Sequence, residues 1–158
     1  MQKIIRISGI VIGLILVFCV GRCLYMVACI SCTPPAIETY EFSGSMDELE
    51  NGLKTYAKSN LNTYCKVSYR GGTTDFSARD VTITRIAGID SLKYQLVIYD
   101  FNGSTRLDLT CLYSTARKLG GCSKKDKGVD ELFSDFKIRF LPSIKRDQNI
   151  SLETTIFK

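Results

Sequence analysis

Asn102 and Gly103 lie between two runs of alternating apolar residues, and this arrangement constrains the fold more than any other feature of the chain. Both positions of a tight hairpin turn need positive φ angles, which Asn and Gly adopt readily. The dipeptide therefore predicts a β-hairpin of residues 92–101 and 104–113. In this register the apolar residues of one face meet apolar partners, with Val97 and Leu112 left on the opposite face. The predicted pairs are Phe101–Ser104, Ile98–Leu107, Leu96–Leu109, Tyr94–Cys111 and Leu92–Tyr113.

Upstream of this hairpin the same kind of alternation predicts further strands, with one helix among them. Ser45 and Glu48 have the spacing of a capping box, which marks the start of a helix over residues 46–59. Gly52 weakens this helix. Its apolar residues recur at helical intervals: Met46, Leu49, Leu53 and Tyr56. The predicted strands are residues 36–42, 64–70 and 81–86.

After the hairpin we expect a polar loop over residues 114–128 and a second helix over residues 129–140, which Pro142 ends. The last residues of that helix also alternate, so a short strand could replace its end. A last strand is expected within residues 150–157. The order is strand, helix, four strands, helix, strand. This order predicts an α+β fold, an antiparallel sheet of four to six strands with two helices packed on one face. We place the domain at residues 37–141 and a C-terminal tail at 142–158.

The N-terminal segment has the layout of an export signal. Lys3 and Arg6 precede an apolar core over residues 7–20, and no acidic residue occurs before Glu38. Basic residues ahead of an apolar core keep the N-terminus in the cytoplasm, so the rest of the chain is expected to cross the membrane. Residues 1–28 are therefore predicted to be a signal peptide or an uncleaved signal anchor.

Cys29 follows Met26, Val27 and Ala28, and this stretch resembles the lipobox of bacterial lipoproteins. The resemblance implies that the Cys29 thiol is acylated and that cleavage makes it the first residue. Two alternatives stay open. Residues 7–30 carry one charge, Arg22, and could remain as an anchor helix, or the protein could be secreted. A tether of residues 29–36 would then lead to the domain, held extended by its two prolines.

The composition narrows the chemistry. The chain has no His, which removes the commonest acid-base group at neutral pH and argues against an enzyme. Of its 21 basic residues three lie in residues 1–28, so the remainder is close to balanced against 16 acidic ones. Nucleic-acid binding is therefore not expected. No cofactor or metal is expected either, because the Cys29–Cys32 pair stands between a signal-like run and a proline pair, without ligands to complete a zinc set.

Three cysteines belong to the predicted domain, and an exported domain forms disulfides readily. Cys111 and Cys122 are separated by a Gly-rich loop, which makes their pairing the first expectation. Pairing of Cys65 with either of them, or three free thiols, are the alternatives. If Cys65 is left over, its place on an apolar face indicates a small core residue rather than a nucleophile.

Two groups of charged residues are the remaining candidates for a site. The first is the basic part of the long loop, which could contact anionic lipid or an acidic partner, although lysines in loops usually serve solubility. The second is a set of carboxylates that could support hydrolysis without histidine. The loop residues are Arg117, Lys118, Lys124, Lys125 and Lys127, and the carboxylates are Asp75, Asp80, Asp100 and Asp108.

The sequence therefore predicts a small protein anchored at the cell membrane, with its domain on the periplasmic or extracellular face. We expect it to act as a binding, scaffold or assembly module for another envelope protein. A periplasmic immunity protein that neutralises a toxin is the alternative, and a toxin gene beside its own would distinguish it. A carboxylate-based hydrolase is the third hypothesis, and it requires at least two converging carboxylates.

Overall fold

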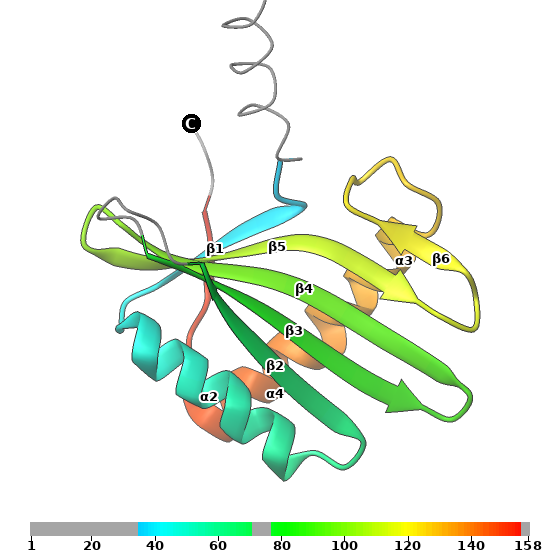
Figure 1. Cartoon of the computed structure of the whole chain (residues 1–158), viewed down its shortest axis with the longest axis horizontal. Helices are drawn as coiled ribbons and strands as arrows, with labels where there is room; N and C mark the ends of the chain where they lie inside the picture. Colours follow the sequence, from blue (N-terminus) through cyan, green and yellow to red (C-terminus); the bar gives the residue numbers. More distant parts are fainter. Residues whose placement is uncertain (1–34, 71–76, 156–158) are drawn as a thin grey trace, which may run out of the picture. The chain divides into compact units, whose positions relative to one another are not determined.

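A computed structural model describes residues 35–70 and 77–155, which belong to one compact unit that begins at Pro35. The segment 1–28, most of the tether, Cys29 and Asp75 lie outside the described residues. Figure 1 shows the elements of the unit. They are β1 (Glu38–Phe42), α2 (Met46–Ser59), β2 (Thr63–Arg70), β3 (Ala78–Ala87), β4 (Asp90–Phe101), β5 (Ser104–Ser114), β6 (Leu119–Gly121), α3 (Val129–Asp135), the π-helical turn η1 (Phe136–Phe140), α4 (Leu141–Gln148) and β7 (Glu153–Thr154).

The strands form one sheet in the order β2-β3-β4-β5-β1-β7, with β6 paired to the far end of β5. Each pairing is antiparallel. The core-facing side chains of the sheet and of both helical segments form a single buried cluster, so the helices pack on one face of the sheet. The α+β class predicted from the sequence is therefore confirmed. The short strand β6 was not expected, because it lies within the segment predicted to be a loop.

The β4–β5 hairpin turns at Asn102 and Gly103, both with positive φ, as predicted. A β-bulge then changes the register at Thr110, because Gln95 pairs with Cys111 while Leu96 pairs with Leu109. The Thr110 hydroxyl donates to the Gln95 carbonyl at 3.0 Å. The extra residue turns Leu112 into the core. The pairs Phe101–Ser104, Ile98–Leu107 and Leu96–Leu109 are confirmed, and Tyr94–Cys111 and Leu92–Tyr113 are wrong.

Helix α2 begins with the predicted capping box. Its two reciprocal hydrogen bonds join the Ser45 hydroxyl to the Glu48 backbone and the Glu48 carboxylate to the Ser45 backbone. Gly52, which weakens a helix by itself, faces the Ile150 side chain, and a Cβ at this position would collide with it. The glycine therefore lets the C-terminal segment approach the helix closely. The buried face of the helix is the predicted one: Met46, Leu49, Leu53 and Tyr56.

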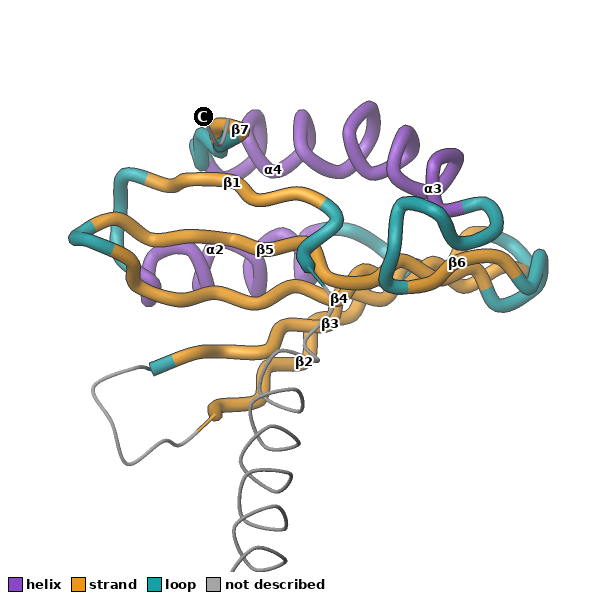
Figure 2. Tube along the Cα trace, turned by 90° about the horizontal axis from the view of Figure 1, so that it is seen from above, coloured by secondary structure: helices purple, strands orange, loops and turns teal. Residues whose placement is uncertain are grey.

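Pro142 does not end the second helix. Segments α3, η1 and α4 form one continuous helix along the sheet, which Figure 2 shows from above. In the π turn the Leu141 amide donates to the Phe136 carbonyl, five residues back. The wider turn accommodates a proline whose ring would otherwise clash with the carbonyl four residues earlier in the helix. Phe136 and Phe140 stay in the core on either side of it, with ring centroids 4.8 Å apart.

The residues after 141 belong to the folded unit instead of forming the tail that we expected. Ile144 of α4 is fully buried, and Ile150 is 5% exposed. The expected last strand is reduced to β7, which pairs with β1 through Tyr40 and Glu41. The helix continues because the π turn absorbs Pro142, and this places α4 beside the C-terminal half of α2.

Candidate functional site

The first predicted site, the disulfide, is present. Cys111 and Cys122 are bonded, and the Tyr113 hydroxyl lies 3.1 Å from the Cys122 sulfur. The bond ties β5 to the loop that follows β6. Cys65 is the free cysteine among the described residues and packs against the core. Burial raises the pKa of the Cys65 thiol, with Lys54 opposing that rise. This environment agrees with a core role.

The basic loop (residues 117–127) uses two of its charges internally. Arg117 bonds to Asp90 at 3.1 Å and also to Glu131. Lys124 reaches Glu38 of β1 at 3.2 Å, which holds the loop beside the start of that strand. Across residues 35–70 and 77–155, the remaining cations of the loop, Lys118, Lys125 and Lys127, form no ion pair and are exposed.

The candidate carboxylates are divided between different surroundings. Asp80 binds Arg70 at 2.6 Å, and Asp108 accepts from the Thr39 hydroxyl at 2.7 Å. Both pair with Val97 of β4, from β3 and β5, so they lie on one face of the sheet two strands apart. Asp100 pairs with buried Thr105, on the opposite face. The described carboxylates therefore each have a structural contact of their own.

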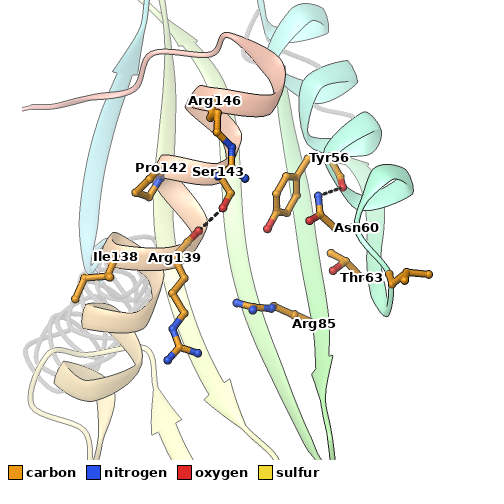
Figure 3. Close-up of a pocket in the computed structure, with 10 residues that line it drawn as sticks. Tyr56, Asn60, Thr63, Arg85, Ile138, Arg139, Pro142, Ser143 and Arg146 are labelled. Carbon is orange, nitrogen blue, oxygen red and sulfur yellow. Dashed lines mark hydrogen bonds between the residues drawn. The ribbon is translucent and has the colours of Figure 1, made fainter.

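A different set of side chains surrounds a pocket of about 370 Å³ that sequence reasoning missed (Figure 3). It opens between the C-terminal end of α2, the adjoining ends of β2 and β3, and the helix around the π turn. We call it the arginine pocket, because three guanidinium groups are its charged lining. Its residues are Tyr56, Asn60, Leu61, Thr63, Arg85, Ile138, Arg139, Pro142, Ser143 and Arg146.

Local structure positions each of these side chains. Thr63 and Arg85 are directly opposite in the β2–β3 pairing, so their side chains share the core-facing side of the sheet. The Asn60 amide caps α2 by donating to the Tyr56 carbonyl at 2.8 Å. On the other wall the Ser143 hydroxyl donates to the Arg139 carbonyl at 2.7 Å, just after the π turn. The pocket walls are thus parts of regular structure.

Arg85 differs sharply from Arg79, the other arginine on the core-facing side of β3. Arg79 binds Glu50 at 2.7 Å and Asp47 at 2.6 Å, so its charge is balanced within the fold. Arg85 is half-buried and forms neither an ion pair nor a side-chain hydrogen bond with any residue that the structure describes. A half-buried cation without a counter-charge is costly, and a ligand anion would supply one.

The two other arginines are only partly engaged. Arg139 uses Nε to bind Asp135 at 3.0 Å, and Arg146 uses Nε to bind Asp147 at 2.8 Å. Their terminal nitrogens make no hydrogen bond within the described parts of the chain. In Figure 3 the Arg146 side chain extends from α4 to one side of the Tyr56 ring, the Arg85 side chain extends from β3 below the ring toward the second helix, and Arg139 points away from both.

Tyr56 is 4% exposed as a residue, and its ring packs edge-on against Phe140, at 5.3 Å between centroids, while it also lines the pocket. Burial raises the pKa of Tyr56, while the charges of Arg85 and Arg146 lower it and Asp147 raises it. The net rise keeps the hydroxyl protonated at neutral pH, so it can donate a hydrogen bond to an anion.

The mouth of the pocket is apolar and exposed. Leu61 is 94% exposed and Ile138 70% exposed, from opposite walls. The sequence carried one signal of this site: Arg85 continues the core-facing positions of Val81 and Ile83, where an unpaired charge is unexpected. The contribution of the second helix was hidden, because Pro142 appeared to end it.

The residues described contain no cluster of three or more His, Cys, Asp or Glu side chains suited to a metal ion. Among the same residues, none of the helices combines the length and the apolar character needed to cross a membrane. No protein-family model matches the chain, and no curated protein or solved structure matches it either.

Proposed function

We propose that this protein is a small membrane-tethered protein of the cell envelope, whose exported domain binds a partner through the arginine pocket. The observation that carries the proposal is the Arg85 guanidinium, which has no counter-charge among the described residues and lies with the buried Tyr56 in an open pocket. Folded domains usually neutralise half-buried charges, so a cost of this kind suits a site that is completed by a ligand.

The composition of the pocket favours binding over catalysis. Its lining contains no carboxylate, no thiol and no amine among the residues that the structure describes, and Tyr56 has a raised pKa. A general base at neutral pH needs a group that is deprotonated there, and none of these side chains is. The chain also has no histidine. Recognition is the function that such a lining supports.

The layout of the domain also supports a tethered binding module. The chain enters the domain just before β1, and Lys124 holds the basic loop beside that strand. The start of β1 lies at the top of Figure 1 and the C-terminal end of α2, which borders the pocket, lies at the bottom. A domain attached to a membrane from its first strand would thus present the pocket at the end away from its attachment.

Location is tested with the Cys29→Ser variant and, as a matched control, Cys32→Ser. Cells are labelled with radioactive fatty acid and fractionated, and intact spheroplasts are treated with protease. We expect the domain in the membrane fraction and sensitive to external protease, with label lost in Cys29→Ser alone. Retention in the membrane fraction without label would indicate that an anchor helix, and not a lipid, attaches the protein. A domain found in the cytoplasmic fraction would contradict the proposal.

A further inference from the structure

We propose that the ligand of the arginine pocket is an acidic segment of a partner protein, in which clustered Asp or Glu side chains stand next to an apolar residue. This inference rests on the proposed function only for the location of the partner, which is the cell envelope. The pocket itself sets the chemistry of the ligand through its charge, its donors and its mouth.

Charge selects an anion with planar carboxylate groups. A guanidinium presents its N–H donors as a fork that matches a carboxylate with two parallel hydrogen bonds. Arg85 has its whole fork available, and Arg139 and Arg146 have their terminal nitrogens available, within the described residues. More than one carboxylate can therefore be accommodated without displacing an internal ion pair.

The size of the pocket also favours several groups. A water molecule takes up about 30 Å³ in the liquid, so a pocket of about 370 Å³ exceeds what one carboxylate or one phosphate fills. The Tyr56 hydroxyl can donate to an acceptor beside the guanidinium groups. A chain carrying neighbouring acidic side chains uses this space better than a single inorganic anion.

The apolar mouth selects a protein segment over a small anion. Leu61 is 94% exposed and Ile138 is 70% exposed beside a charged centre. A small anion would leave these side chains in water, whereas an apolar neighbour in a polypeptide would cover them. Arginine and tyrosine are also among the side chains enriched at the positions that dominate protein–protein binding.

The test uses the full chain in intact cells, with a photo-crosslinking amino acid in place of Ile138. Because that side chain is 70% exposed at the mouth of the pocket, the replacement leaves the core unchanged. We expect a covalent adduct with one protein, and mass spectrometry of the joined peptide should find the crosslink within a segment rich in Asp and Glu. The same amino acid at Lys125, in the basic loop, is the position control.

Arginine variants then ask whether the pocket makes the contact. Loss of a charge-assisted hydrogen-bond pair weakens binding by about tenfold or more, so Arg85→Gln should reduce the adduct by at least that factor. Arg85→Lys, which keeps the charge but not the fork, should give a smaller reduction. Arg146→Gln tests the opposite wall at a position too exposed to affect folding. Arg70→Gln removes one positive charge outside the pocket and should leave the adduct unchanged.

Four outcomes would overturn this inference. An adduct with lipid would assign the pocket to a phosphate headgroup instead. A joined peptide without acidic residues, or no adduct, would remove the acidic partner. An adduct equally reduced by Arg70→Gln and Arg85→Gln would show general attraction between charges rather than a pocket. The fractionation of the same cells reports the tether separately, so a failed membrane location is distinguishable from a failed pocket.

Discussion

The basic loop and the arginine pocket are both positively charged, yet their charges are used in opposite ways. In the loop, Arg117 and Lys124 are bound by carboxylates of neighbouring elements, and the other cations point into solvent. In the pocket, residues from α2, β2, β3, η1 and α4 line one opening, and Arg85 has no counter-charge among the described residues. The basic residues that are close in sequence therefore belong to a surface loop fixed by ion pairs. The candidate site is formed instead by arginines that are distant in sequence and close in space.

The comparison predicts first that the loop, and not the pocket, contributes to stability. Replacing Cys111 and Cys122 together with Ala removes a crosslink that spans a sequence separation of 11. The free energy of unfolding should fall by about 2–4 kcal/mol, because the unfolded chain regains the freedom that the disulfide removes. Urea unfolding under non-reducing conditions measures this. An unchanged midpoint would mean that the loop is held mainly by its ion pairs.

The second prediction concerns Asp90, the carboxylate that anchors the loop. The pKa of Asp90 is held below its usual value, first by a hydrogen bond from the Ser114 hydroxyl. Burial opposes this effect, and hydrogen bonds from the Ala116 amide and Arg117 add to it. Asp90→Ala should lower the free energy of unfolding by about 1–3 kcal/mol at pH 7, because buried Ser114 loses its acceptor.

The pH dependence of that difference has a definite sign. A carboxylate with a lowered pKa stabilises the folded state above its unfolded pKa of about 3.9, and this contribution is lost as the pH falls through the folded value. The free energies of unfolding of the wild type and Asp90→Ala should therefore approach each other below about pH 4. A difference that stays constant down to pH 2 would contradict the role of the ionised carboxylate.

A third, smaller effect separates the bound from the unbound charges within the loop. Arg117 is 39% exposed and links Asp90 to Glu131, so Arg117→Ala should lower the free energy of unfolding by about 0.5–1 kcal/mol. Lys125→Ala should change it by less than about 0.5 kcal/mol. Thermal unfolding of the two variants side by side measures the contrast, and equal effects would remove the distinction.

The smallest effect is expected in the pocket. Arg85→Gln should not lower the free energy of unfolding, because no carboxylate among the described residues loses a partner. Arg79→Gln is the matched control on the same strand, and it should destabilise clearly, since buried Glu50 loses a donor. If Arg85→Gln destabilised as much as Arg79→Gln, the pocket arginine would be a structural residue.

The features that local chemistry determines were predictable from the sequence. The turn at Asn102 and Gly103, the capping box of α2 and the Cys111–Cys122 bond each depend on a few neighbouring residues. The bulge at Thr110 was not predictable in the same way, because it depends on whether burial of Leu112 outweighs the hydrogen bonds of a regular strand pairing. The one sign of the bulge in the sequence was Leu112, an apolar residue that the regular hairpin places on the polar face.

The pocket required information that no local pattern contains. Pro142 indicates the end of a helix, and only the π turn, stabilised by Phe136 and Phe140 in the core, lets the helix continue to Arg146. Without α4 beside α2, Arg85 has no opposite wall. The described candidate carboxylates do not form a site, because nothing in their sequence spacing places them close together in the fold.

The position of β1 in the sheet has a consequence for how the domain folds. Strands β2 to β5 form a meander of neighbours, whereas β1 pairs with β5, and the hydrogen bond between Thr39 and Asp108 joins residues 69 positions apart. A chain delivered N-terminus first exposes β1 long before its partner strand arrives, and such distant pairings form late. The first strand to emerge is thus among the last to pair. A chain truncated before residue 104 would contain β1 without the strand with which it pairs.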